Sequence, residues 1–259
     1  MTGASSGIGW ATARALATRG AKVIAVARRQ GRLEQLVEEL GGEPHSFVCC
    51  DVSDLNQVRS MARAASEITP RLDVLVNGAG IPGPGPIQRA TSEELEQVIR
   101  TNLLGPIWCT KELLPLIERA SRSGRTPAIV NVASMAGRIA LPRSAGYTAT
   151  KFGLVGFSES VWDEMSVKGI RTILVNPGFT QTEGFSMDPL LRNPALRWTV
   201  MGPNRVAEAI CAAVERGSFE VRVQWWWNLG YYFTLVLGPL RRLVVSRVSS
   251  EAGNVGENL

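Results

Sequence analysis

The sequence predicts an α/β fold in which one doubly wound parallel sheet carries helices on both faces. Two observations support this prediction. Short apolar runs alternate with segments of helical periodicity along the chain, which is typical of parallel strands joined by crossover helices. A glycine-rich turn near the start leads directly into the first expected helix. Because no linker or internal repeat interrupts the alternation, we expect one domain over residues 1–223 and an apolar extension over residues 224–259.

The expected strands are short apolar runs without a helical period. Most of them are rich in valine and isoleucine, which favour buried strands. They cover residues 23–27, 46–50, 74–76, 128–132 and 172–175. The gaps between them are long enough for the helical crossovers that parallel strands need.

Three helices can be placed from their pattern. The first runs from Ile8 to about Thr18, directly after the glycine-rich turn. The second covers residues 30–40, where leucines share one face and the pair Gly41-Gly42 ends the helix. Ser92 is the expected N-cap of a third helix, which has acidic residues in its first turn and includes Asn102.

One strand that this fold requires is missing at the N-terminus. The glycine-rich turn should follow a buried strand, yet only Met1 precedes the turn at residues 2–9. In a doubly wound sheet that strand is central, so its loss would leave unpaired backbone groups on both sides. Three explanations are open: a start assigned too late, which we favour, a fragment, or another segment that takes the strand's place.

The glycine-rich turn is a candidate binding site for a pyrophosphate. Glycines let the backbone turn sharply and approach a phosphate, and the amides at the start of the following helix would point at it. A loop that merely needs positive φ angles would explain the same glycines. The candidate residues are Gly3, Ser5, Ser6, Gly7, Ile8 and Gly9.

Arg28 and Arg29 indicate which nucleotide this turn would bind. They follow the strand 23–27, whose end meets the adenosine ribose in a Rossmann-type sheet. An acidic residue there would bind the 2′-hydroxyl of NAD, whereas guanidinium groups pair with the 2′-phosphate of NADP. Arg28 is the better candidate, and both residues could instead be solvated charges that open the next helix. The sequence therefore predicts NADP(H) as the cofactor.

Tyr147 and Lys151 are the candidate proton-transfer pair. Residues four apart on a helix share one face, so the phenol and the ammonium group would be neighbours. A nearby cation favours phenolate, and we expect it to lower the pKa of Tyr147 from its ordinary value near 10. Tyr147 could then donate or accept a proton near neutral pH.

Ser134 and Asn102 are expected to join this pair. Ser134 follows the strand 128–132, and active clefts in such sheets lie at the carboxyl ends of strands. Its hydroxyl could bond a substrate carbonyl and stabilise developing oxyanion charge, while the Asn102 amide could hold a water in a proton relay. A turn-forming serine and a helix-kinking asparagine are the simpler alternatives.

Taken in order, these motifs resemble those of the short-chain dehydrogenase/reductase (SDR) family over roughly residues 2–223. The shared motifs are the glycine-rich turn, Asp51-Val52, Asn77-Gly78-Ala79-Gly80, Asn102, Ser134, Tyr147-x-x-x-Lys151 and Asn176-Pro177-Gly178. Gly78 departs from the family, which usually has a second asparagine there, and the change would alter loop rigidity more than chemistry.

The resemblance implies further cofactor contacts. Asp51 would contact adenine, Asn77 would support the cofactor pocket, and Lys151 would also bind the nicotinamide ribose. Thr180 or Thr182 would hold the carboxamide or phosphate region. The remaining implied contacts are Val52, Ala79, Gly80, Tyr147, Pro177 and Gly178.

Residues 183–203 lie where the family places its substrate lid. Their apolar side chains suggest an apolar substrate, although packing of the lid on the domain would explain them equally well. These side chains are Phe185, Met187, Leu190, Leu191 and Trp198.

An uncharged aromatic stretch opens the C-terminal extension at residues 225–240, and Arg241, Arg242 and Arg247 follow it. The stretch is shorter than the roughly 20 residues that a spanning helix needs. Tryptophan and tyrosine beside arginine are typical of a membrane–water interface, so we expect membrane-surface contact through residues 225–247. A subunit interface or a wall of the substrate pocket would explain the same pattern.

The composition limits the other partners. The formal charge of +5 comes mostly from scattered arginines, which argues against nucleic-acid binding. With one histidine and no Cys-x-x-Cys pair, the sequence offers no metal site. No signal peptide is visible, so we expect a cytoplasmic homo-oligomer, peripheral on the membrane where the extension makes contact. Four free thiols should be buried, with the first two on opposite faces of one strand: Cys49, Cys50, Cys109 and Cys211.

The expected activity is NADP(H)-dependent interconversion of a lipophilic secondary alcohol and its ketone by hydride transfer, with Tyr147 as general acid or base. A 3-oxoacyl thioester reductase and a non-catalytic NADP-binding scaffold are the alternatives. The apolar extension favours a free lipid over a carrier-bound thioester. The scaffold is disfavoured because binding alone would not require the complete set of Asn102, Ser134, Tyr147 and Lys151.

Overall fold

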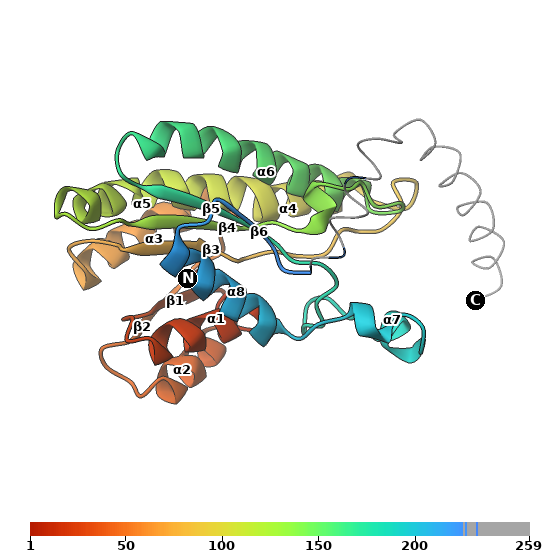
Figure 1. Cartoon of the computed structure of the whole chain (residues 1–259), viewed down its shortest axis with the longest axis horizontal. Coiled ribbons are helices and arrows are strands. Elements are labelled where there is room, and N and C mark those ends of the chain that lie inside the picture. The colour runs from red at the N-terminus through yellow and green to blue at the C-terminus, as the bar shows by residue number, and fades with distance from the viewer. Residues whose placement is uncertain (225, 227–231, 233–259) are drawn as a thin grey trace.

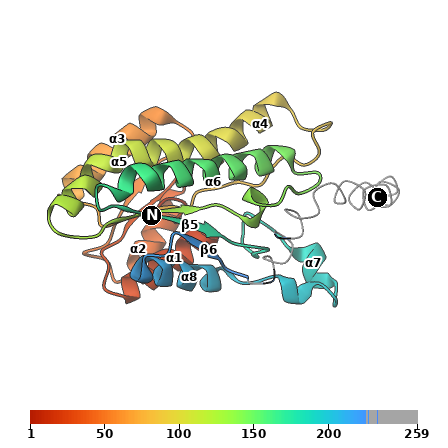
Figure 2. The ribbon, with the colours of Figure 1, turned by 45° about the horizontal axis from the view of Figure 1, so that its top comes forward.

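The structure is a computed structural model, and it describes residues 1–224, 226 and 232. Its strands run parallel, and helices cover both faces of the sheet (Figure 1, Figure 2). One face carries α1 (Gly7–Thr18), α2 (Gln30–Glu39) and α8 (Pro203–Arg216). The other carries α3 (Leu55–Ile68), α4 (Ser92–Ile99), α5 (Gly105–Arg122) and α6 (Ala145–Ser166). The predicted doubly wound α/β fold is confirmed.

The sheet has two hydrogen-bonded parts, β2–β1 and β3–β4–β5–β6. The strands are β1 (Ile24–Ala27), β2 (Ser46–Cys49), β3 (Val74–Asn77), β4 (Ala128–Val132), β5 (Arg171–Asn176) and β6 (Glu220–Arg222). The five predicted strands are all present, and their ends lie within one residue of those predicted. The sequence did not indicate β6, because two of its three residues are charged and form no apolar run.

The backbone of residues 1–4 lies between the two parts of the sheet. Thr2 pairs in parallel with Val26 of β1 on one side and with Asn77 of β3 on the other. The Val26 N–H donates to the Met1 carbonyl at 2.8 Å, and the Thr2 N–H donates to the Val76 carbonyl at 2.9 Å. The sequence predicted a gap with unpaired backbone groups at this place, and this short pairing bridges it.

The N-cap of α4 is Thr91 rather than the predicted Ser92. The Glu94 N–H donates to Thr91 Oγ1 at 3.2 Å, and the Thr91 N–H donates to Glu94 Oε2 at 2.9 Å. This reciprocal capping box selects the residue that has glutamate three positions later. The helix also does not continue regularly to Asn102, since a π-helical turn, Arg100–Leu104, separates α4 from α5.

The core lies on both faces of the sheet, which explains the uninterrupted apolar runs of β3 and β4. Leu75 packs with the residues of α3 and α5, whereas Val76 packs on the opposite face with those of α8. Cys50 is buried as predicted, but Cys49 is exposed. Their opposite orientation is confirmed, and the outward side chain is uncovered because β2 is an edge strand. Cys109 and Cys211 are buried and free.

The glycine-rich turn connects the central backbone to α1. Gly3 has φ of +71°, a conformation that favours glycine. A Cβ atom at Gly9 would lie 2.0 Å from the Gly3 carbonyl oxygen, well inside contact distance. The first turn of α1 can therefore pack on the loop only if residue 9 has no side chain.

We expect Gly9→Ala to lower the free energy of unfolding by about 1–3 kcal/mol or more, because the turn must shift to admit a methyl group. Gly31→Ala in α2 is the matched control, since a Cβ there meets nothing within 4 Å. It should leave stability unchanged or raise it by up to about 1 kcal/mol. Urea unfolding followed by circular dichroism measures both variants, and equal stability of the two would contradict the packing argument.

Candidate active site

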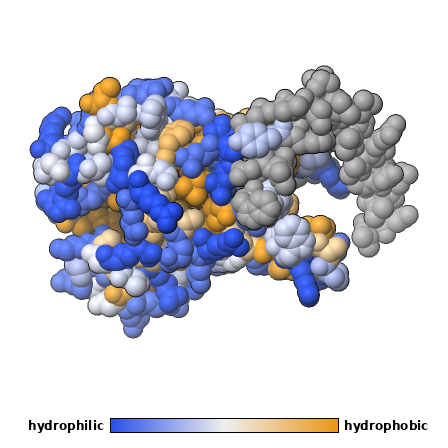
Figure 3. Space-filling model, in the orientation of Figure 1, coloured by the Kyte–Doolittle hydropathy of each residue, from blue (hydrophilic) through white to orange (hydrophobic). Residues whose placement is uncertain are grey.

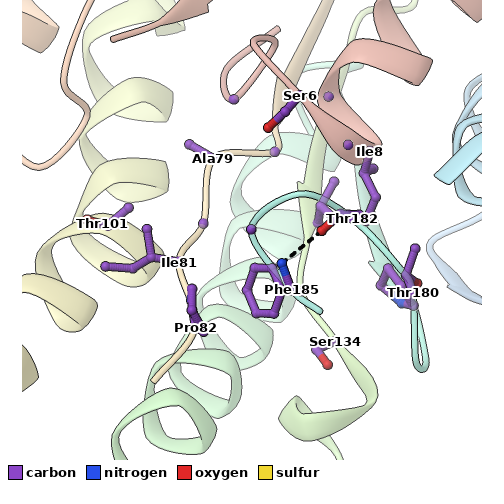
Figure 4. A pocket seen from close by; sticks show the side chains of 18 of the residues that line it. Ser6, Ile8, Ala79, Ile81, Pro82, Thr101, Ser134, Thr180, Thr182 and Phe185 are labelled. Carbon is purple, nitrogen blue, oxygen red and sulfur yellow. Dashed lines mark hydrogen bonds between the residues drawn. The ribbon is translucent and has the colours of Figure 1, made fainter. Parts of the chain in front are cut away.

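A cleft of about 610 Å³ lies at the carboxyl ends of the strands. Parallel strands all end at the same edge of the sheet, so the segments that follow them meet there. The cleft is lined by residues directly after β1, β2, β3, β4 and β5 and by the start of α1. Figure 4 shows these segments converging from opposite sides of the cleft.

Nearly all site residues predicted from the sequence line this one cleft. They are Gly3, Ser5, Ser6, Gly7, Ile8, Gly9, Arg28, Arg29, Asp51, Val52, Ala79, Gly80, Ser134, Tyr147, Lys151, Pro177, Gly178, Thr180 and Thr182. Asn77 and Asn102 are buried beside the cleft but do not line it. The tertiary structure therefore brings together residues that are spread over most of the domain.

The start of α1 forms one wall of the cleft. Its N-cap residue, Ser6, makes no side-chain capping hydrogen bond, so the first amides of the helix carry no cap from that side chain. Thr182 packs directly over Gly7, since a Cβ atom added to Gly7 would lie 2.9 Å from the Thr182 Cβ. Helix amides beside a glycine-rich turn fit the phosphates of a dinucleotide.

Arg28 lies close to Asp51 at the end of the cleft that the segments after β1 and β2 form. Its Nη1 is 3.5 Å from Asp51 Oδ2, and the guanidinium is largely exposed. Burial acts to raise the pKa of Asp51, but hydrogen bonds from Ser53 and the charge of Arg28 hold that pKa below its usual range. Asp51 is therefore an ionised carboxylate that partly neutralises Arg28.

Arg29 and Arg32 gather around Ser5 and Glu183. Arg29 donates from Nη2 to Ser5 Oγ at 3.1 Å and from Nη1 to Glu183 Oε1, and Arg32 donates from Nε to the Ser5 carbonyl at 3.3 Å. Sequence reasoning did not identify Glu183 as a cleft residue or Arg32 as its neighbour. The helical spacing of Arg29 and Arg32 was a signal that could have placed them on one face, but nothing in the sequence paired them with Glu183.

Tyr147 and Lys151 lie one helical turn apart in α6, as predicted, with the Lys151 Nζ 5.6 Å from the centre of the Tyr147 ring. Burial raises the pKa of Tyr147 to about 12, while an interaction with the Ser134 hydroxyl acts to lower it. The expected lowering by Lys151 is therefore wrong for this structure. Burial also lowers the pKa of Lys151 to about 8. Burial is the largest cause of both shifts, and no hydrogen bond joins Tyr147 to Lys151 among the described residues.

Lys151 is held by the end of β4. Its Nζ donates to the Val132 carbonyl at 3.1 Å, and only 4% of the residue is exposed. Ser134 follows two residues later and begins a short 3-10 turn, Met135–Gly137, where the Ala136 N–H donates to Ser134 Oγ at 3.1 Å. The end of β4 thus orients both the lysine and the serine toward Tyr147.

Asn102 supports the loop after β3. Its Oδ1 accepts from the Ile81 N–H at 2.8 Å, and its Nδ2 donates to the Ile81 carbonyl at 2.8 Å. A Cβ atom at Gly80 would lie 3.4 Å from Asn102 Oδ1 and 3.8 Å from Lys151 Nζ, so these two groups flank the same glycine. The π-helical turn places Asn102 where it can bond this loop.

Asn77 belongs to a buried polar network beneath the cleft. Its Nδ2 donates to Asn131 Oδ1 at 2.8 Å and to Thr110 Oγ1 at 3.1 Å, and Asn131 Nδ2 donates to Ser158 Oγ at 2.9 Å. The network ties β3 and β4 to α5 and α6. The expected support of the cofactor pocket by Asn77 is therefore indirect, through the strand ends.

The opposite end of the cleft is apolar. Its lining includes Ile81, Pro82, Leu141, Phe179, Phe185 and Met187. The Phe185 ring packs edge-on against Tyr147, with 5.8 Å between ring centres and 60° between planes. A substrate that reaches the Tyr147 hydroxyl therefore meets hydrocarbon and aromatic surface.

The predicted lid contains α7 (Asp188–Arg192) and a 3-10 turn, Arg197–Thr199. Of its apolar residues, Phe185 and Met187 line the cleft, whereas Leu190, Leu191 and Trp198 do not. Trp198 is 65% exposed and packs against Trp226, with ring centres 5.5 Å apart. Figure 3 shows apolar and polar side chains side by side on the lid around α7.

Most of the extension, including the aromatic stretch and its arginines, lies outside the described residues. Gln224 at its start donates from Nε2 to the Thr199 carbonyl at 2.7 Å, so the extension begins against the lid. Within residues 1–224 and the two further described positions, no helix has the length and apolar character to cross a bilayer.

Comparison with known proteins agrees with this geometry. Residues 1–188 match the family model described as short chain dehydrogenase. The ketoacyl reductase HetN of Nostoc is 34% identical over 227 residues, which cover 86% of this chain and 77% of that protein.

Two solved structures extend the likeness to three dimensions. One is a 3-ketoacyl-(acyl-carrier-protein) reductase from Brucella melitensis, complexed with NADH, which has a TM-score of 0.77 at 28% identity. The match covers 86% of this chain and 95% of the reductase chain. The other is an actinorhodin polyketide ketoreductase with NADPH, which has a TM-score of 0.76 at 30% identity. This match covers 86% of this chain and 93% of the ketoreductase chain. Sequence, fold and cleft agree, and the chain belongs to the short-chain dehydrogenase/reductase family of oxidoreductases.

Proposed function

We propose that this chain is an NADP(H)-dependent oxidoreductase that interconverts a lipophilic secondary alcohol and its ketone. The observation that carries the proposal is the polarity of the cleft. Guanidinium groups gather at the end of β1, while Tyr147, Ser134 and Lys151 lie at the other end beside apolar lining. An anionic nucleotide and an apolar carbonyl compound match these two ends.

The residues of the cleft fit the cofactor. The glycine-rich turn, in which Gly9 cannot accept a Cβ, and the amides of α1 suit a pyrophosphate. Arg28 and Arg29 suit a 2′-phosphate, and Lys151 is placed to bind the nicotinamide ribose. Bound NADP(H) supplies or accepts the hydride. The two cofactors named in the compared structures, NADH and NADPH, show that relatives of this fold accept either, so preference depends on this chain's own arginines.

The side chains near Tyr147 divide the proton chemistry among them. With a pKa of about 12, Tyr147 is protonated at neutral pH and can donate to the oxygen of a carbonyl substrate. Ser134 can donate a hydrogen bond to the same oxygen and stabilise its developing charge. The Lys151 ammonium then stabilises the tyrosinate that forms, since a cation favours the charged phenolate. Alcohol oxidation uses the reverse steps and requires Tyr147 to lose its proton first.

Reduction of a 3-oxoacyl thioester is the second candidate. The names of the compared ketoacyl reductases favour it, and it would use the same Tyr147, Ser134 and Lys151. A free lipophilic ketone and a carrier-bound thioester can be distinguished by turnover of one substrate of each kind. A non-catalytic scaffold is disfavoured because these three side chains converge in one cleft.

We expect Tyr147→Phe to abolish turnover of a ketone substrate while leaving NADPH affinity within about threefold, because the hydroxyl acts on the substrate. Lys151→Ala should damage both, since the lysine serves the cofactor as well. Steady-state kinetics and fluorescence titration measure the two effects. Near-normal kcat in Tyr147→Phe would refute the acid/base role.

We expect NADPH to bind about tenfold to a hundredfold more tightly than NADH, from charge-assisted contacts worth about 1.5–3 kcal/mol. Arg28→Ala and Arg29→Ala should each weaken NADPH binding and leave NADH binding nearly unchanged. Arg14→Ala in α1 is the control, because Arg14 is exposed and does not line the cleft. Equal or tighter binding of NADH by the unaltered protein would overturn the cofactor assignment.

We propose that the extension contacts a membrane surface and delivers the substrate to the lid. Intact protein should float with anionic vesicles, and a truncation before Trp225 should not, because aromatic residues and Arg241, Arg242 and Arg247 would be removed. If the extension instead forms an interface between subunits, truncation should change the oligomer size measured by light scattering. Absence of flotation at low salt would end the membrane proposal.

A further inference from the structure

Glu183 is the first residue of the lid, and its carboxylate lies at the end of β1. Oε1 accepts a hydrogen bond from Arg29 Nη1, and Oε2 lies 3.9 Å from Arg32 Nη2. Both arginines belong to the segment that follows β1, where the proposed function places the 2′-phosphate of NADP(H). One internal carboxylate thus bridges the two guanidinium groups at that position.

The two arginines are held by contacts that do not involve Glu183. Arg29 donates from Nε and Nη2 to Ser5 Oγ at 3.3 and 3.1 Å. Arg32 donates to the Ser5 carbonyl at 3.3 Å, and its guanidinium stacks 4.7 Å from the centre of the Trp10 ring. Because Ser5 and Trp10 orient the guanidinium groups, an anion position would persist between them if Glu183 moved away.

A phosphate group can replace the Glu183 carboxylate on these arginines. Hydrogen bonding to Arg29 holds the pKa of Glu183 below its usual range, so the group is ionised at neutral pH. Its side chain is 53% exposed, and exposed ion pairs are weak. A phosphate monoester carries about −1.5 to −2 charge at pH 7 and three strong acceptor oxygens. It therefore has the stronger attraction for the same two arginines.

We propose that Glu183 is an internal competitor of the 2′-phosphate: its carboxylate binds Arg29 and Arg32 until NADP(H) displaces it, and NAD(H) leaves it in place. This inference rests on the proposed NADP(H) preference and assigns Glu183 as a specificity-determining residue. Breaking the ion pair lowers the affinity for NADP(H), and the contacts of its 2′-phosphate with the two arginines replace what is lost.

Displacement of Glu183 also reaches the substrate end of the cleft. Thr182 and Phe185 form one tight turn, in which each N–H donates to the other carbonyl at 3.2 Å and the Phe185 N–H also lies 3.2 Å from Thr182 Oγ1 (Figure 4). The Phe185 ring packs on Tyr147. Because Glu183 lies inside this turn, we expect its release from the arginines to shift the turn and the Phe185 ring that packs on Tyr147. NADP(H) binding and access to Tyr147 are then coupled, and the coupling is reciprocal.

The first experiment compares NADPH and NADH affinities of the unaltered chain, Glu183→Gln and Asp188→Asn by fluorescence titration. Glu183→Gln keeps the shape and removes the charge, so NADPH should bind at least about threefold more tightly, while NADH changes less. Asp188→Asn removes the same charge from the same lid, and among the described residues Asp188 forms no ion pair with Arg29 or Arg32. It should change neither affinity by more than about 1.5-fold.

The outcomes separate the inference from the function on which it rests. If the unaltered chain does not prefer NADPH, the cofactor proposal fails. If it prefers NADPH but the NADPH-to-NADH affinity ratio is unchanged or lower in Glu183→Gln, the cofactor proposal stands and the competitor role of Glu183 is overturned.

A second experiment follows the lid itself by limited trypsin digestion and mass spectrometry. The bonds after Arg192 and Arg197 lie in the exposed lid. In the unaltered chain, 2′,5′-ADP should speed their cleavage about threefold or more, whereas 5′-AMP should not. Glu183→Gln should be cleaved at the faster rate without nucleotide. Equal rates with both nucleotides in the unaltered chain would overturn the link between Glu183 and lid position.

Discussion

The backbone pairing of residues 1–4 joins the two parts of the sheet, and the cleft depends on it. Thr2 bonds β3 and the Met1 carbonyl accepts from β1, so both neighbours are held at strand spacing. The chain then leaves this central position directly into the glycine-rich turn and α1. Because the crossovers on either side of the centre run in opposite directions, a crevice opens at this edge of the sheet. The arginines after β1 reach it from one side, and Ser134 after β4 and Tyr147 of α6 reach it from the other.

Charge is distributed unequally along the cleft. At the end after β1, the guanidinium groups of Arg28, Arg29 and Arg32 each have a carboxylate partner, Asp51 or Glu183, and the pairs are partly exposed. At the other end, Lys151 is buried and its described partner is a neutral carbonyl. Burying an ammonium beside a carbonyl costs stability, and such perturbed groups are typical of functional sites. The two ends therefore differ in both charge and burial.

Two asparagines support this arrangement without lining the cleft. Asn102 bonds both backbone groups of Ile81 and fixes the loop after β3, and Asn77 connects the ends of β3 and β4 through Asn131. Both are almost completely buried. Most buried polar groups need partners, so these bonds favour the observed arrangement of strands and helices. That arrangement holds Gly80 against Lys151 and leaves the strand ends in register.

The sequence alone determined β1 to β5, the glycine-rich turn and the Tyr147–Lys151 pair, because apolar runs, glycine spacing and helical spacing are local properties. The sequence did not determine β6, because its charged residues form no apolar run. It also did not determine that Thr91 caps α4, because Thr91 and Ser92 are adjacent and either residue type can cap a helix. Only the tertiary structure decided that burial raises the pKa of Tyr147 and that Glu183 meets Arg29 across 154 positions of chain. Desolvation and long-range ion pairs depend on which segments pack together, and that information is absent from any local stretch of sequence.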